Sequence, residues 1–238
     1  MKKTMTIAIA TCAYSDRNYG QILQAFALQK YLENCGYQVY IIDYTPSCIE
    51  YRLGPNKWKQ YLKYFVKNLP LIKTYAIKKH EKQQSIEKKQ NNRSFSDFKK
   101  RYLKYSTIKY SQIKELRKNP PIADFYITGS DQIWGKSSPN PYPYLLQFVD
   151  SPNKMSYATS FGRSHLEAYE IPIFRNELRK YTKIGVREVG GVEICKSLNL
   201  HNSQFTPDPT ILLQPLEWKQ LLTPGNLFKT QKKKIFIY

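Results

Sequence analysis

The chain has 238 residues and a mass of 28.1 kDa, and its 38 Lys+Arg against 18 Asp+Glu give a formal net charge of +20. Hydrophobic residues make up 41% and aromatic residues 14%, which is more apolar side-chain surface than disordered chains carry. No run of about 18 consecutive apolar residues occurs, which excludes a membrane-spanning helix. The apolar run near the N-terminus leads straight into charged residues, so we expect a first strand there rather than a signal peptide.

Apolar strands and helices alternate from the N-terminus onward. Residues 5–11 form an apolar run with β-branched side chains, and residues 38–43 form a second one. Between them, residues 20–36 have apolar side chains at helical spacing, with Gly36 as the stop signal. Strand, helix and strand within about 40 residues is typical of a parallel α/β sheet. We therefore expect a Rossmann-like domain over residues 1–211.

The same alternation returns in the second half of the chain. Apolar runs predict strands at 123–128, 155–160 and 183–186, and helical patterns lie near 170–181 and 192–198.

The C-terminal residues have a different pattern. Residues 212–231, with Pro215 and Pro224, are predicted to be an interdomain linker. Residues 232–238 begin a new apolar run, which we interpret as the first strand of a second domain. The chain is thus expected to be the N-terminal part of a larger protein.

Most of the positive charge lies in one segment. Residues 57–118 hold 19 Lys+Arg and 4 Asp+Glu, a local net charge of +15. Apolar side chains from Trp58 onward fall on one helical face with lysines between them, and Pro70 is expected to break the helix. We predict a basic helical insertion over residues 56–119.

The role of the insertion has several interpretations. Its apolar stripe is expected to pack on the domain while the lysines remain solvated. Alternatively, the insertion contacts an anionic membrane surface, or it is a module for nucleic acid or an acidic glycan. Nucleic acid is disfavoured because the basic residues follow no known binding motif.

Polar residues follow three of the predicted strands, where open α/β sheets bind ligands. Asn18, Tyr19 and Gly20 begin the first helix, whose N–H groups favour an anion; the alternative is a plain turn with a helix cap. Ser130, Asp131 and Gln132 follow the strand at 123–128 and offer groups that bind hydroxyls or accept a proton. Trp134, two residues after Gln132, offers a stacking face, and the alternative is again a turn with a helix cap.

Arg187 follows the strand at 183–186. A guanidinium binds two oxygens of a phosphate or carboxylate, although an ion pair with Glu188 or another surface acid is the alternative. Four scattered cysteines include no C-x-x-C pair, and no two of the three histidines lie near each other, so neither a disulfide framework nor a metal site is expected. Cys12 is interpreted as a buried thiol rather than a nucleophile.

Together these blocks resemble the polysaccharide pyruvyl transferase family, in order and approximate spacing over most of residues 5–215. The resemblance rests on five segments: NYG with LQAFAL (18–28), GSDQIW (129–134), SYATSFG (156–162), VRE with GVEIC (186–195) and DPT (208–210).

The resemblance implies a fold similar to the GT-B glycosyltransferases, with this chain as the N-terminal domain. It implies transfer of the enolpyruvyl unit of phosphoenolpyruvate to a sugar, which forms a pyruvate ketal on a surface polysaccharide or its precursor, with no further cofactor. Arg187 is expected to contact the donor, with the turns at 18–20 and 130–132 in the cleft wall. A histidine of the second domain is expected to be the general acid, so this chain alone is expected to be inactive.

The implied partners are phosphoenolpyruvate and a saccharide acceptor that is lipid-linked in one interpretation. The implied location is the cytoplasm, with peripheral contact at the inner face of the membrane. Two other functions remain open from the residues: a nucleotide-sugar glycosyltransferase of similar fold, and a basic membrane- or nucleic-acid-binding module.

Overall fold

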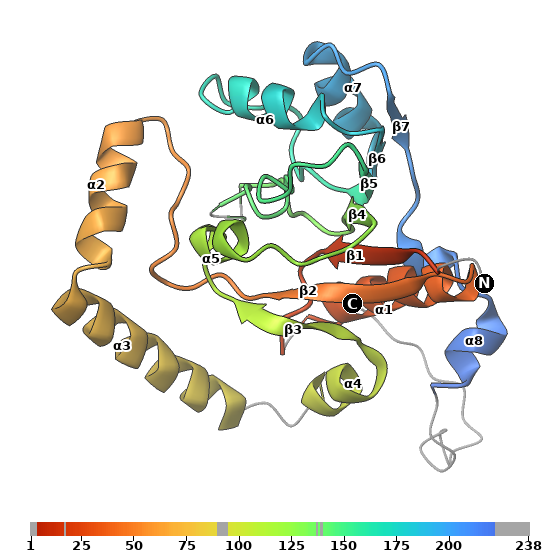
Figure 1. Cartoon of the computed structure of the whole chain (residues 1–238), viewed down its shortest axis with the longest axis horizontal. Coiled ribbons are helices and arrows are strands. Elements are labelled where there is room, and N and C mark those ends of the chain that lie inside the picture. Colours follow the sequence, from red (N-terminus) through yellow and green to blue (C-terminus); the bar gives the residue numbers. More distant parts are fainter. Residues whose placement is uncertain (1–3, 17, 90–94, 137, 139, 222–238) are drawn as a thin grey trace, which may run out of the picture.

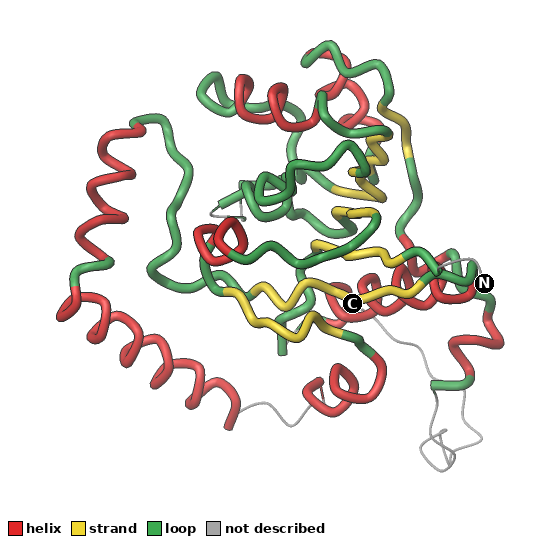
Figure 2. Tube along the Cα trace, in the orientation of Figure 1, coloured by secondary structure: helices red, strands yellow, loops and turns green. Residues whose placement is uncertain are grey.

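Seven parallel strands form one sheet, which confirms the predicted Rossmann-like α/β fold (Figures 1 and 2). The computed structural model describes residues 4–16, 18–89, 95–136, 138 and 140–221. The strand order is β3-β2-β1-β4-β5-β6-β7, so the chain changes direction across the sheet between β1 and β4. The strands are β1 (Thr6–Ala10), β2 (Gln38–Tyr44), β3 (Tyr105–Tyr110), β4 (Phe125–Thr128), β5 (Lys154–Thr159), β6 (Lys183–Val186) and β7 (Ser203–Phe205).

Helices and loops cover both faces of the sheet. Along β1, Ile7 and Ile9 join the core cluster that contains α1, whereas Ala8 and Ala10 join the cluster on the other face. Since alternate side chains of a strand point to opposite faces, a strand covered on both sides is a continuous apolar run. The helices are α1 (Tyr19–Asn34), α2 (Lys57–Lys67), α3 (Pro70–Lys89), α4 (Phe95–Tyr102), α5 (Ile113–Lys118), α6 (Ile171–Leu178), α7 (Val189–Ser197), the 3-10 turn η1 (Pro209–Ile211) and α8 (Pro215–Lys219).

Helix α1 has the boundaries that its sequence signals predict. The Asn18 side chain accepts a hydrogen bond from the Gln21 N–H at 3.2 Å and caps the first turn. At the other end Gly36 has φ of +90°, a left-handed conformation that glycine adopts without strain.

The basic insertion is not helical throughout, which corrects the prediction for residues 56–119. The segment holds α2, α3 and α4, but it also contains β3 and α5. Of the side chains in β3, only Tyr110 is buried, because β3 is an edge strand of the sheet. A mostly exposed strand has no apolar run, so its sequence gave no signal. The short edge strand β7 was missed for the same reason.

The apolar stripe of the insertion does not pack on the domain as expected. Helix α2 has no buried residue, and Figure 1 shows α2 and α3 standing away from the strands. Pro70 does end the first helix, since α2 stops at Lys67 and the proline begins α3. Among the residues that the structure describes, no helix is long and apolar enough to cross a bilayer.

The first part of the predicted linker is an ordered helix. In α8, Trp218 packs against Phe26 of α1 with ring centroids 5.8 Å apart, and Glu217 accepts a hydrogen bond from Asn34. The rest of the predicted linker, and the strand predicted at 232–238, lie outside the described residues.

Candidate functional site at the carboxyl edge of the sheet

The sheet topology brings the predicted site loops to a single edge. The loops at 18–20, 130–132 and 187 follow β1, β4 and β6, and the carboxyl ends of parallel strands lie at the same edge. Adjacent strands are about 4.8 Å apart, so the tips of β4 and β6 are about 10 Å apart and those of β1 and β6 about 14 Å. The loops therefore share an edge, and the β4 turn is nearer to Arg187 than the β1 loop is.

Gln24 of α1 joins the ends of β1 and β4. Its buried side-chain amide donates to the Thr11 hydroxyl at 2.9 Å and to the Cys12 carbonyl at 3.2 Å. Its oxygen accepts from the backbone N–H of Ser130 at 3.0 Å. One side chain thus fixes both loops next to the point where the strand order reverses, a role that apolar patterning alone does not indicate.

Backbone hydrogen bonds continue this connection to β6. The Ser160 N–H donates to the Asp131 carbonyl at 2.9 Å, and the Arg187 N–H donates to the Thr159 carbonyl at 3.1 Å. Gly129 is required at the start of the turn, because a Cβ there would lie 2.0 Å from the carbonyl oxygen of Tyr157. The turns after β4, β5 and β6 therefore form one hydrogen-bonded series.

Two acidic residues hold the Arg187 side chain. Its Nη1 donates to Asp208 Oδ2 at 3.1 Å, and its Nε lies 3.6 Å from Glu188 Oε1. The Asp208 carboxylate also caps η1 by accepting from the Thr210 N–H at 3.0 Å. The Arg187 side chain remains 27% exposed, and no hydrogen bond among the described residues uses its Nη2. The alternative considered for Arg187, an ion pair with Glu188 or another surface acid, is therefore present with both Glu188 and Asp208, and Asp208 makes the shorter contact.

Helix α7 begins directly after Arg187. The N-cap residue, Glu188, makes no side-chain cap hydrogen bond. Among the described residues, no hydrogen bond uses the N–H groups of Val189 and Gly190, and both residues are exposed. Unsatisfied N–H groups at a helix start favour an anion. Gly191 lets the helix approach β6, because a Cβ there would lie 3.1 Å from the Cβ of Val186.

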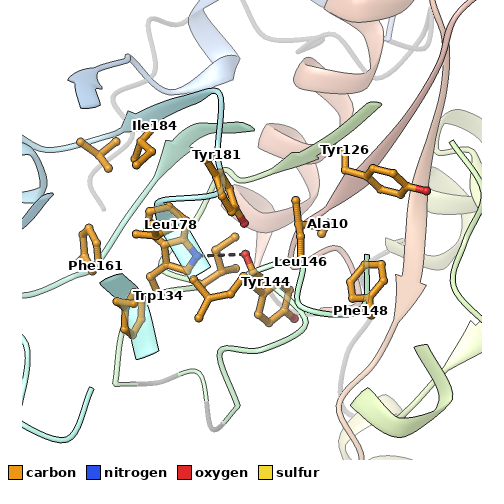
Figure 3. Close-up of a cluster of buried hydrophobic side chains, with 14 of the residues drawn as sticks. Ala10, Tyr126, Trp134, Tyr144, Leu146, Phe148, Phe161, Leu178, Tyr181 and Ile184 are labelled. Carbon is orange, nitrogen blue, oxygen red and sulfur yellow. Dashed lines mark hydrogen bonds between the residues drawn. The ribbon is translucent and has the colours of Figure 1, made fainter. Parts of the chain in front are cut away.

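Trp134 is not a stacking face, contrary to our expectation. It is fully buried among Phe161, Phe174 and Tyr181, and its Nε1 donates to the Tyr144 carbonyl at 3.1 Å (Figure 3). The large apolar area of the indole is removed from water here, and its one polar group is satisfied.

Ser130 is also buried, and its hydroxyl donates to the Ala158 carbonyl at 2.9 Å, so its side chain is not free for a ligand. In the same turn, Asp131 is half-buried with φ of +88° and Gln132 is exposed. In the β1 loop, Asn18 caps α1, and Tyr19 is exposed with its ring 4.6 Å from that of Phe95.

The Cys12 thiol lies buried at this edge. Burial raises the pKa of Cys12 to about 12, so its thiol stays protonated at neutral pH. Within the described residues, no group of three or more His, Cys, Asp or Glu side chains is arranged to hold a metal ion.

Two cavities lie near this edge, and neither has Arg187 or a residue of the turns at 18–20 and 130–132 in its lining. One, of about 400 Å³, lies over β1, β2 and β3, where burial raises the pKa of the Asp43 carboxyl against the effect of Lys109 and Lys99. The other, of about 620 Å³, is lined by the loops after β2, β4 and β5. Arg163 secures its wall through two hydrogen bonds to Glu170, at 2.7 and 2.9 Å.

The comparison with known families supports the resemblance seen in the sequence. A family model described as polysaccharide pyruvyl transferase matches residues 18–237. No curated protein and no solved structure matches the chain.

Proposed function

The chain belongs to the polysaccharide pyruvyl transferase family, and we propose that it binds phosphoenolpyruvate at the β6–α7 turn. The donor supplies its enolpyruvyl unit to a sugar. One sugar hydroxyl adds to C2 of phosphoenolpyruvate and loses its proton, while the C3 methylene carbon of phosphoenolpyruvate takes up a proton. The bond between C2 and the phosphate oxygen then breaks, and a second hydroxyl adds to C2 with loss of its proton, which closes the ketal and releases phosphate. We assign the binding of phosphoenolpyruvate to the turn from Arg187 to Gly190, and we assign protonation of its C3 carbon to no residue of this turn.

The observation that carries this proposal is the position of Arg187. Its partly exposed side chain stands at the tip of β6, directly before the first turn of α7, where Glu188 makes no side-chain cap hydrogen bond. Phosphoenolpyruvate carries a phosphate and a carboxylate, and both charges are best met by a guanidinium fork and by backbone N–H donors. The turn supplies both the guanidinium and the backbone N–H groups within four consecutive residues, from Arg187 to Gly190.

The acids beside Arg187 orient it and compete with the donor. Asp208 is held in place by its cap of η1, so it fixes the direction of the guanidinium. Glu188 lies farther from Arg187 and is more exposed, so its contact is the one that an incoming anion displaces. An arginine fixed in this way loses little side-chain entropy on binding.

Calorimetric titration of phosphoenolpyruvate into the chain tests the assignment. We expect Arg187→Gln to weaken binding by at least about tenfold, since a hydrogen bond to a charged group contributes about 1.5–3 kcal/mol. The matched control is Arg179→Gln, which removes the same charge from an exposed position near the amino end of β6 and is expected to leave the affinity unchanged.

Thermal unfolding of both variants establishes that they are folded. Equal affinity of the Arg187 variant and the wild type would refute the donor site. Binding of UDP-sugars in the same calorimetric titration, with no binding of phosphoenolpyruvate, would instead favour a nucleotide-sugar glycosyltransferase.

A further inference from the structure

Helices α2 and α3 form an arm that stands apart from the sheet (Figures 1 and 2). We define the arm as residues 57–89. It joins the body through the loop after β2, which it contacts through α2 and through the backbone of Ala76. The arm plays no part in the donor site, so it needs a separate explanation.

Helix α2 presents its polar side to the body. Gln60, Tyr64 and Lys67 are its half-buried residues, and they recur at helical spacing. The Tyr64 ring lies 6.1 Å from that of Tyr51, and the Lys67 ammonium lies 3.5 Å from the Cys48 carbonyl oxygen. This is the reverse of an ordinary surface helix, which buries its apolar side.

The apolar side of α2 therefore faces outward. Trp58 is 84% exposed, and Tyr61, Leu62 and Phe65 are each at least 60% exposed. Spacings of three, four and seven residues put these side chains on one face of the helix. Helix α3 adds Leu71, which is 87% exposed. Exposed apolar side chains gathered on one helix face mark an interaction surface.

Lysines border this apolar face. Lys57, Lys59 and Lys63 are exposed on the same helix, within the segment whose local net charge is +15. An apolar stripe with tryptophan and tyrosine, flanked by lysines, is the composition of helices that lie in the interface of an anionic bilayer.

We propose that the arm docks on an anionic lipid surface through the apolar face of α2. The helix inserts Trp58, Leu62 and Phe65 among the lipid acyl chains, while the flanking lysines contact the headgroups. A second copy of the chain fits less well, because pairing two such faces brings like-charged lysines together. Nucleic acid would engage the lysines and leave Leu62 and Leu71 exposed. The inference rests on the arm alone and does not depend on the proposed function.

Vesicle flotation tests the proposal with the full chain. We expect flotation with phosphatidylcholine vesicles that contain phosphatidylglycerol, and none with phosphatidylcholine alone. Each basic residue near the surface changes partitioning by about fivefold, so added salt should release the chain. Equal flotation with neutral vesicles would overturn the electrostatic part of the proposal.

A double variant, Trp58→Glu with Phe65→Glu, is expected to abolish flotation. Both positions are exposed, so neither substitution disturbs the core. The matched control is Ile122→Glu with Leu216→Glu, which makes the same charge change at exposed apolar positions outside the arm and is expected to float like the wild type. Trp58 fluorescence should shift to the blue on anionic vesicles.

Three results would overturn the proposal. The first is wild-type flotation by the Trp58/Phe65 variant. The second is a wild-type chain that does not float but forms dimers in light scattering, while the Trp58/Phe65 variant stays monomeric. The apolar face of α2 would then bind a second copy of the chain. The third is binding to duplex DNA without binding to vesicles.

Discussion

The buried amide of Gln24 provides the sharpest test of how this edge is held together. Replacing it with leucine keeps a similar volume but removes both hydrogen-bonding groups. The Ser130 N–H then loses its acceptor, and the Cys12 carbonyl and the Thr11 hydroxyl lose a donor. These groups lie in the interior, where water does not replace the missing partners.

The expected loss of folding stability follows from the polar groups that Gln24→Leu leaves without a partner. An orphaned buried polar group costs about 1–3 kcal/mol, and the Ser130 N–H carries that penalty in full. The Thr11 hydroxyl loses less, because it still donates to the Ser130 carbonyl at 3.0 Å. We expect Gln24→Leu to lower the free energy of unfolding by about 2–4 kcal/mol, which leaves a typical domain folded.

Gln29 offers a matched control on the same helix. It is also buried, and it joins α1 to the segment before β3 by accepting from the Lys104 N–H at 2.8 Å and donating to the Tyr102 carbonyl at 3.0 Å. Gln29→Leu should therefore cost similar stability. Only Gln24→Leu should weaken phosphoenolpyruvate binding, by about tenfold or 1.4 kcal/mol, because only Gln24 supports the turns that connect to Arg187.

Urea unfolding gives the stability of each variant, and calorimetric titration gives its affinity for phosphoenolpyruvate. Equal weakening of binding by both variants would show that the effect comes from lost stability rather than from the edge. An unfolding free energy of Gln24→Leu within about 0.5 kcal/mol of the wild type would refute the hydrogen-bond reasoning.

Two further predictions follow from buried ionisable groups. Burial raises the pKa of Cys12 and Cys195 to about 12. Iodoacetamide should therefore label the exposed Cys35 in the native chain and leave Cys12 and Cys195 unlabelled until urea unfolds the chain, with the labelled sites identified by mass spectrometry. Labelling of Cys12 in the native chain would contradict its burial. Burial also raises the pKa of Glu50, so the contribution of this carboxyl to stability is complete below its unfolded pKa of about 4.3 and is lost as the pH rises through the folded pKa. In urea titrations, the free energy of unfolding of Glu50→Gln minus that of the wild type should therefore rise between about pH 4 and pH 7. A difference that stays constant over this range would refute the raised pKa of Glu50.

The central strands could be predicted from the sequence because they are covered on both faces. β1, β2, β4, β5 and β6 each contain a short apolar run, and all five were found within a residue or two of their bounds. The edge strands β3 and β7 were missed, since few of their side chains are buried. Apolar patterning reports burial, and a strand at the edge of the sheet has little of it.

The same limit applies to Trp134 and to the arm. The pattern around Trp134 shows an aromatic residue after a strand, but it does not show whether the ring faces a ligand or the core. In α2 the helical spacing of the apolar residues was recognised, but the face that meets the body depends on the loop after β2. Periodicity gives the faces of a helix, and only the tertiary structure says which of them is covered.

The sequence does contain a signal for Gln24 that apolar patterning passes over. The run from Ala25 to Leu28 is apolar, and a glutamine lies at each end of it; both glutamines are buried. A buried glutamine must find a donor and an acceptor, and strand ends supply both, because their outermost backbone groups leave the ladder. Gln24 reaches Ser130, 106 residues away in the chain. In α1 the two buried glutamines therefore mark the places where the helix bonds to backbone beside strand ends, although their partners become known only from the fold.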